Sequence, residues 1–216
     1  MRKLTLTLAA AGVAALTIGT LQAQQGGPPP IPGTMDVSRA EAGTYAADPN
    51  HTLIGWRVNH LGFSDYFGIF GGSTGTLTID PAAPQNAKVD ITVPVASVTT
   101  ANPGLTGHLL KPAGESGKAD FFGASPAPAH FVSTKVEPNG TRATITGDLT
   151  LNGVTKPVVI EAEFTGAGKA MMPPNRVTLG FEGTTTIKRS DFGVAYGIPL
   201  VSDEVELNIT TAFEKQ

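Results

Sequence analysis

Apolar residues recur at every second position over most of the chain from His51 to Phe213. This spacing places them on one face of a β-strand. The segments that show it most clearly are Ile54, Trp56 and Val58; Val89, Ile91 and Val93; Val158, Ile160, Ala162 and Phe164; Val177, Leu179 and Phe181; and Val205, Leu207 and Ile209. Short strands with Gly-rich turns and little helical periodicity predict an all-β fold, either a sandwich or a closed antiparallel barrel.

Turn signals separate several of these strands. Asn152-Gly153 lies between two apolar runs and predicts a type I′ hairpin turn. Two stretches break the strand pattern: residues 97–123, which predict a short helix or structured loop, and residues 166–175, which predict an apolar loop containing Met171 and Met172. Because methionine adapts its shape to irregular surfaces, the second loop is predicted to form part of a tunnel mouth. The alternative is that its methionines only pack against other apolar residues.

The N-terminal part divides into two segments. Arg2 and Lys3 precede an uncharged apolar stretch, and a small residue, Ala23, closes it, which predicts a cleaved signal peptide over residues 1–23; a retained anchor is the alternative. Residues 24–43 are rich in Pro and Gly and predict a linker. The globular domain is therefore expected over residues 44–216 of an exported protein.

Composition narrows the classes of partner. The formal charge is −3 and would fall to −5 without Arg2 and Lys3. A mildly acidic chain with no Lys/Arg cluster argues against a nucleic-acid partner. The chain has no Cys, so disulfides and acylation at Cys are excluded. Exposed strand edges are compatible with a homodimer. If the protein carries an apolar ligand, transient contact with a membrane is compatible with that role.

Histidines are the main candidates for polar chemistry. His60 continues the inward parity of the 54–58 strand, where it would meet a ligand head group or be satisfied as a core residue; His108 lies in the irregular segment. His51 is expected in a turn, and His130 is expected to be exposed. The chain shows no H-E-x-x-H pair, nucleophile elbow or phosphate loop. We therefore expect no metal, no cofactor and no catalytic residue; an enzyme using His60 or His108 as base is the alternative.

The ten Phe residues offer apolar surface along the whole domain. Core packing accounts for most of them, but a barrel of about eight strands either fills its interior or holds one ligand. A long hydrocarbon would gain roughly 0.8 kcal/mol per buried CH₂ group. A filled barrel with a structural or stress-related role is a further alternative. The Arg189 and Asp191 side chains, which flank Ser190, are expected to pair with each other or to cap a barrel end; contact with a ligand is the alternative.

Ordered motifs extend through the domain. They are Asp48-Pro49-Asn50-His51-Thr52, Val58-Asn59-His60-Leu61-Gly62-Phe63-Ser64, Phe70-Gly71, Val95-Ala96-Ser97-Val98-Thr99-Thr100, His108-Leu109, Asp120-Phe121-Phe122, Phe131-Val132-Ser133-Thr134, Gly147 to Val158, and Lys188-Arg189-Ser190-Asp191-Phe192-Gly193. In this order they resemble the YceI-like family of periplasmic, lipocalin-like barrel proteins that bind polyisoprenoid-type lipids. In one departure, Leu105-Thr106-Gly107 stands where the family usually has an Arg-Asp pair.

The resemblance implies an extended antiparallel barrel with an apolar central tunnel and carriage or sequestration of an isoprenoid or other long-chain lipid rather than catalysis. Parity and resemblance together give the residues predicted to contact that ligand: Ile54, Trp56, Val58, His60, Phe63, Phe70, Leu105, His108, Leu109, Phe121, Phe131, Phe164, Met171, Phe181 and Phe192.

Overall fold

The computed structural model of the protein describes residues 30–115 and 117–216, and the predicted signal peptide lies outside them. Ten strands form the domain: β1 (Gly43–Ala47), β2 (Leu53–His60), β3 (Ser64–Phe70), β4 (Thr74–Ile79), β5 (Lys88–Val93), β6 (Ala129–Asn139), β7 (Arg142–Leu151), β8 (Val154–Lys169), β9 (Val177–Lys188) and β10 (Glu204–Lys215). One helix, α1 (Pro103–Leu109), and the short 3₁₀ turns η1 (Val37–Arg39), η2 (Pro84–Asn86), η3 (Val95–Ser97) and η4 (Arg189–Phe192) complete them.

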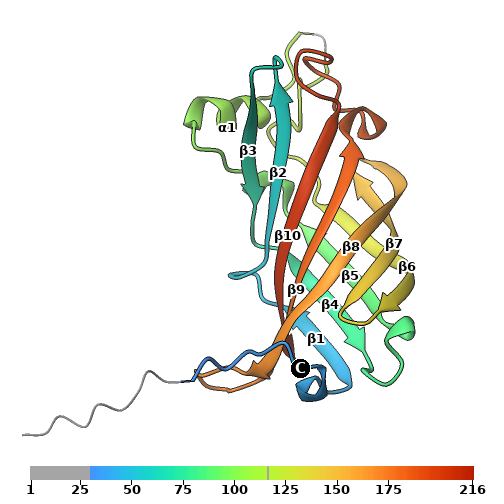
Figure 1. The fold of residues 1–216 in the computed structure, drawn as a ribbon. Helices are drawn as coiled ribbons and strands as arrows, with labels where there is room; N and C mark the ends of the chain where they lie inside the picture. The colour runs from blue at the N-terminus through green and yellow to red at the C-terminus, as the bar shows by residue number, and fades with distance from the viewer. Residues whose placement is uncertain (1–29, 116) are drawn as a thin grey trace, which may run out of the picture. The chain divides into compact units, whose positions relative to one another are not determined.

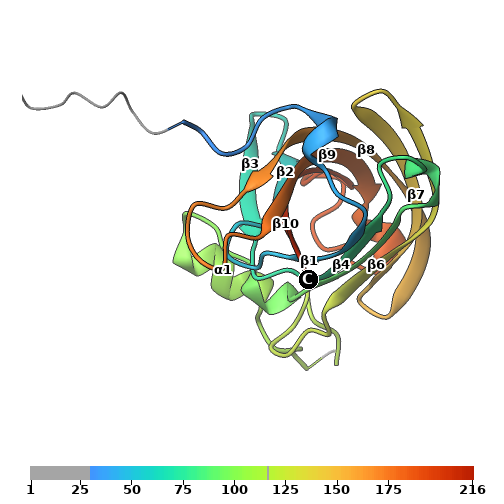
Figure 2. The same ribbon diagram turned by 90° about the horizontal axis from the view of Figure 1, so that it is seen from below.

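The strands close into an antiparallel barrel, as the sequence predicts. The strand order is β1-β4-β5-β6-β7-β8-β9-β10, and pairing of β1 with β10 closes the ring at eight strands (Figures 1 and 2). The predicted hairpin turn is confirmed between β7 and β8, where Asn152 and Gly153 have φ values of 53° and 77°. These positive values fit a type I′ turn, whose twist matches that of the flanking strands.

Two interruptions divide the barrel wall into an upper and a lower half, in the orientation of Figure 1. The chain breaks between β1 and β2 at residues 48–52 and between β3 and β4 at residues 71–73. In the lower half β1 pairs with β4 and with the end of β10. In the upper half β2 pairs with β3 and with the beginning of β10. Different strands therefore build the same side of the wall in the two halves.

The upper half leaves β3 at the end of the strand order, and α1 with its flanking segments lies beside that strand (Figure 1). Backbone hydrogen bonds of 2.9 Å join Ile69 and Thr99 in both directions. The Asn102 side chain caps α1 by accepting from the N–H groups of Gly104 and Leu105. The Phe122 N–H then donates to the Leu109 carbonyl, which ties the following loop to the end of the helix.

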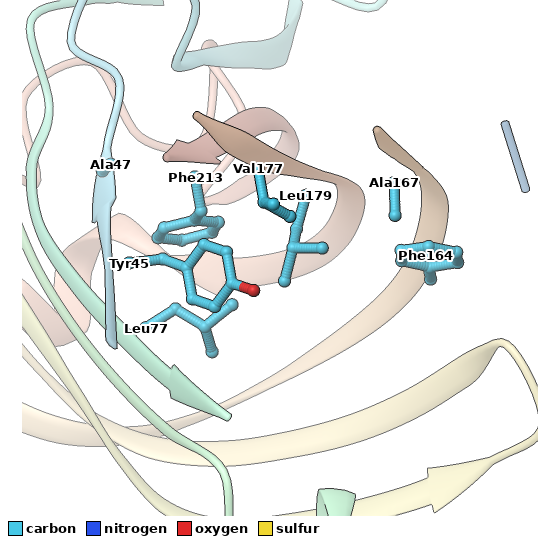
Figure 3. Close-up of a cluster of buried hydrophobic side chains, with 8 residues drawn as sticks. All are labelled: Tyr45, Ala47, Leu77, Phe164, Ala167, Val177, Leu179 and Phe213. Atoms are coloured by element: carbon cyan, nitrogen blue, oxygen red, sulfur yellow. The ribbon is translucent and has the colours of Figure 1, made fainter. Parts of the chain in front are cut away.

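The lower end contains a compact apolar cluster. Figure 3 shows its side chains, which come from β1, β4, β8, β9 and β10: Tyr45, Ala47, Leu77, Phe164, Ala167, Val177, Leu179 and Phe213. The Tyr45 hydroxyl is satisfied because it donates to the Glu41 carbonyl at 2.6 Å. Inward residues of five neighbouring strands therefore pack against one another at this end, because side chains alternate between the two faces of a strand.

The segment before β1 packs on the barrel. Thr34 and Ala167 exchange two backbone hydrogen bonds, of 3.1 and 2.8 Å. A Cβ atom at Gly168 would lie 2.0 Å from the Pro32 carbonyl oxygen, so only glycine permits this approach. The described part of the predicted 24–43 linker thus includes a stretch held against β8, a contact for which the sequence has no local signal.

Among the described residues, no helix has the length and apolar character needed to cross a membrane.

Candidate functional site

The lower half of the barrel encloses an apolar cavity of about 360 Å³. Inward residues of β4 to β10 form most of its lining: Leu77, Ile79, Val89, Ile91, Phe131, Ile145, Ile160, Ala162, Phe164, Leu179, Phe181, Ile209 and Phe213. Many of these side chains stand two positions apart on the same strand, which is the alternation seen in the sequence. Aliphatic and aromatic walls of this kind suit a hydrocarbon rather than a polar molecule.

The upper half encloses a second cavity of about 460 Å³. Its apolar wall includes Trp56, Val58, Phe70, Val95, Leu105, Leu109, Phe121, Phe122, Ala129, Leu151, Ile187, Val194, Val201 and Val205. Five polar or ionisable side chains join them: His60, Tyr66, His108, Arg189 and Tyr196. The upper cavity therefore combines a greasy wall with a small number of polar groups, as ligand sites usually do.

The two cavities meet inside the barrel. Ile54, Val93, Leu149 and Leu207 line both of them. These four apolar side chains come from β2, β5, β7 and β10 and form a junction between an upper and a lower chamber. The barrel thus holds two adjoining apolar cavities with a shared part of their wall, which we call the lower and upper chambers of its channel.

An aromatic cluster made of His108, Phe121 and Tyr196 stands at the upper chamber. The three ring centroids lie 5.3–5.4 Å apart with edge-to-face geometry. The His108 Nε2 atom is 2.8 Å from an Asp120 carboxylate oxygen, which orients the imidazole. The cluster joins α1, the loop after it and the loop before β10, so three segments that are distant in sequence meet at this wall.

Trp56 forms a further part of the upper wall. Its indole lies over Gly68 of β3, where a Cβ atom would be 2.2 Å from the ring, so glycine makes room for the indole. The buried Trp56 Nε1 finds no hydrogen-bond partner among the described residues. An unpaired buried donor is costly in a folded protein, and this one lies against Gly68.

Arg189 is the buried cation of the upper chamber, with 6% of its surface exposed. Its guanidinium donates to the carbonyls of Ser202, Val194, Tyr196 and Val201 at 2.8–2.9 Å. Burial lowers the pKa of Arg189, and the charge of Asp203 opposes that change. The predicted pairing with Asp191 is therefore wrong: η4 turns the chain, and backbone carbonyls take the guanidinium instead.

Most of the predicted ligand-contacting residues line the channel. Those in the upper chamber are Ile54, Trp56, Val58, His60, Phe70, Leu105, His108, Leu109 and Phe121. Phe131, Phe164 and Phe181 line the lower chamber. Their contact with a ligand stays a prediction, but their placement follows from strand parity and, for the helical segment, from the packing of α1 beside β3.

Three predicted residues lie elsewhere. Phe63 is 90% exposed, because the chain turns at Leu61 and Gly62 and strand parity ends at His60. Met171 is exposed in the loop beyond the end of β8. Phe192 is fully buried, but it packs with Val158 and Ile187 and belongs to neither chamber lining.

Sequence reasoning missed Tyr66, Arg189 and Tyr196 as lining residues. Tyr66 shares the parity of Phe70, so the period of two contained a usable signal. Tyr196 lies in an irregular loop, and only the tertiary contact with His108 brings it to the chamber. Arg189 enters the wall because η4 bends the chain after β9.

The other two histidines pair with carboxylates outside the channel. His51 Nδ1 is 2.5 Å from Asp48, and His130 Nε2 is 2.7 Å from Asp90. Both positions agree with their predicted placement, in a turn and in an exposed site. Within residues 30–115 and 117–216, no three His, Asp or Glu side chains gather as a metal site would require.

Comparison with known proteins gives a consistent result. The family profile described as the YceI-like domain matches residues 45–213. A UPF0312 protein of Ectopseudomonas mendocina is 41% identical over 173 residues, which cover 78% of this chain and 86% of the relative.

Two solved structures share the fold. BcnA of Burkholderia cenocepacia superimposes with a TM-score of 0.64 and 25% identity, covering 77% of this chain and 98% of BcnA. A polyisoprenoid binding domain from Saccharophagus degradans gives a TM-score of 0.57 at 13% identity, covering 80% of this chain and 98% of that domain. The second likeness concerns the fold alone.

Proposed function

This chain belongs to the YceI-like family, and from that premise we propose that it binds and carries an isoprenoid-type or other long-chain apolar lipid in its two-chamber channel. The observation that carries the proposal is the continuity of the apolar lining across the four junction residues Ile54, Val93, Leu149 and Leu207. The fold likeness to the polyisoprenoid binding domain of Saccharophagus degradans is in line with this ligand class.

The proposed orientation of the lipid follows from the difference between the chambers. The lower chamber is lined mainly by hydrocarbon side chains and would take the tail. The upper chamber offers the side chains of His60, Tyr66, His108 and Tyr196 and would take the polar head group. Each CH₂ group moved from water into the channel contributes roughly 0.8 kcal/mol, before the cost of association.

Carriage without catalysis is part of the proposal, as is a periplasmic location after removal of residues 1–23. The four carbonyl contacts already engage the Arg189 guanidinium, which suits it to a structural role in the chamber wall.

The deciding experiment is native mass spectrometry of the protein purified from its own periplasm, with lipid extraction of the same sample. We expect a stoichiometric prenyl or fatty-acyl species. Titration of delipidated protein with polyprenols of increasing length, read from the emission of the single Trp56, should give tighter binding for longer chains. A protein that holds no lipid and takes up none of these chains contradicts the proposal.

A further inference from the structure

Large apolar side chains are exposed at the upper end of the barrel. Phe63 in the β2–β3 turn is 90% exposed, Leu200 in the loop before β10 is 65% exposed, and Leu61 is 45% exposed. We call these three residues the apolar tip. Figure 1 shows the β2–β3 turn and the loop before β10 at the same end of the barrel. Exposed apolar groups that gather in one place mark an interaction site, whereas scattered ones are ordinary.

Backbone hydrogen bonds hold the two loops of the tip together. The Leu61 N–H donates to the Leu200 carbonyl at 2.7 Å, and the Ser202 N–H donates to the Asn59 carbonyl at 2.9 Å. Arg189 holds the second loop through the carbonyls of Val194, Tyr196 and Val201. Leu61 and Gly62 have φ values of 59° and 72°, and the Phe63 N–H donates to the His60 carbonyl, which fits a type I′ hairpin turn; leucine is an unusual residue at its first central position.

The tip adjoins the upper chamber. His60 immediately precedes Leu61, and Val201 immediately follows Leu200; both line the chamber and form a backbone bridge with each other. Tyr196, in the same loop as Leu200, is half exposed and also lines the chamber. Whatever binds the apolar tip is therefore placed next to the polar part of the channel.

The charges at this end are balanced. Residues 59–64 and 192–202 contain no Asp, Glu, Lys or Arg. The neighbouring loop after α1 carries two cations and two anions, namely Lys111, Glu115, Lys118 and Asp120, and Arg57 pairs with Asp65 beside the turn. A partner recognised here would be apolar and without a net charge requirement, which fits the interior of a lipid interface better than a charged protein surface.

We propose that the apolar tip inserts into the interface of a lipid bilayer and sets the upper chamber against the membrane. Aromatic and leucine side chains on loops suit the boundary between head groups and acyl chains. A lipid that passes between bilayer and channel at this point would avoid exposing its chain to water. This role in lipid exchange rests on the proposed function. The contact itself is independent of lipid uptake.

The opposite end provides a matched control. Met172, in the loop between β8 and β9, is 79% exposed, but this loop contributes to neither chamber and is flanked by Lys169 and Arg176. Phe63 and Met172 are thus both exposed apolar loop residues, and they differ in whether the loop adjoins the channel. Since the chain has no Cys, one introduced cysteine can be labelled at either position.

The test uses the Phe63→Cys and Met172→Cys variants, each labelled with a polarity-sensitive nitrobenzoxadiazole dye and mixed with phosphatidylcholine vesicles. We expect a shift to shorter wavelength and a several-fold increase in intensity for the label at position 63 only, unchanged by added salt. Replacing both Phe63 and Leu200 with Ser should weaken vesicle binding in flotation by about tenfold or more, because each removed side chain contributes to apolar burial.

A silent label at position 63, or equal responses at both positions, overturns the proposal. The proposal is also overturned if adding unlabelled protein, without vesicles, produces the same response from the label at position 63. That result would assign the tip to contact with a second copy of the chain. Lipid uptake from solution, followed by Trp56 emission, separates the two hypotheses: uptake with a silent label refutes the membrane contact alone, and a label response without uptake refutes the carrier function alone.

Discussion

The two chambers of the channel are built in different ways. The lower chamber is lined by strands whose inward residues follow the period of two almost without interruption, and the apolar cluster of Figure 3 lies at its end. The upper chamber combines β2, β3 and β10 with α1, the loop after it and the loop before β10. The histidines and tyrosines of the lining belong to the second arrangement, because irregular segments bring residues together without regard to strand parity, whereas the lower lining includes Arg142 and Glu182.

This difference assigns the two parts of ligand recognition to different chambers: the length of the apolar chain to the lower one and the identity of the head group to the upper one. A mainly hydrocarbon wall gains free energy from any apolar chain roughly in proportion to buried area, so affinity in the lower chamber should depend on chain length. The upper chamber places a few donors and rings at fixed positions, and unpaired polar groups discriminate strongly between head groups. Variants that affect one chamber and spare the other therefore test the comparison directly.

The largest expected effect is on the upper half, from Arg189→Met. This change removes a buried guanidinium and leaves four carbonyl partners without it, which we expect to destabilise the fold by about 3–5 kcal/mol. Chemical denaturation measures the loss. Arg57→Met is the control, because that guanidinium is exposed and its two acidic partners remain in water; an equal loss in both variants would contradict the role given to Arg189.

A plug at the junction should separate the chambers. Leu207→Trp places a larger ring between them, and a chain that no longer extends into the lower chamber loses about five CH₂ contacts or more, roughly 4 kcal/mol gross. We expect the Kd of a long polyprenol to rise by two to three orders of magnitude, about the equivalent of that loss. Short prenols should bind as before.

The control for the plug is Asn208→Trp, one position along β10, where the side chain points out of the barrel. It should leave the dependence of Kd on chain length unchanged. If Leu207→Trp, with its fold confirmed by circular dichroism, binds long and short chains as the unaltered protein does, then the two chambers do not share one ligand.

A smaller effect is expected from His108→Phe, which keeps a ring against Phe121 and Tyr196 but removes the hydrogen bond to Asp120. Because both partners are about one-third exposed, we expect a loss of only about 0.5–1 kcal/mol in the free energy of unfolding, together with altered head-group preference. His130→Phe removes a similar bond to Asp90 outside the channel and should leave head-group preference unchanged. Equal ligand effects from both variants would exclude a specific role for His108.

The smallest effect concerns the break between β1 and β2. His51 lies in this break, and the hydrogen bond between His51 and Asp48 raises the pKa of His51. Protonated His51 therefore favours the folded state. This stability is fully present below the unfolded pKa of about 6.5 and is lost as pH rises through the higher folded pKa. The difference in thermal stability between the unaltered protein and His51→Gln should therefore close with rising pH; a difference that is constant across this window would contradict the linkage.

Alternation predicted an all-β fold and most of the channel lining, because it fixes which residues of a strand face inward. The family resemblance decided for a barrel over a sandwich, and Asn152-Gly153 predicted the β7–β8 hairpin. Sequence reasoning failed where strands end. Phe63 belongs to a motif that carries the resemblance, but it has the opposite parity to Ile54, Trp56 and Val58, and the turn at Leu61 and Gly62 leaves it exposed. Arg189 and Asp191 have the spacing of a strand pair, yet they lie in η4, where the chain bends and backbone carbonyls bind the guanidinium.

The sequence by itself determined the strand alternation, the apolar interior and the lack of cysteine chemistry, since these depend only on residue type and spacing. The tertiary structure alone decided that the barrel wall breaks in two, that α1 packs beside β3, and that His108, Phe121 and Tyr196 meet at one chamber. It also decided that Leu61, Phe63 and Leu200 share one end of the molecule. Contacts between segments distant in the chain depend on closure of the barrel, and no local pattern encodes them.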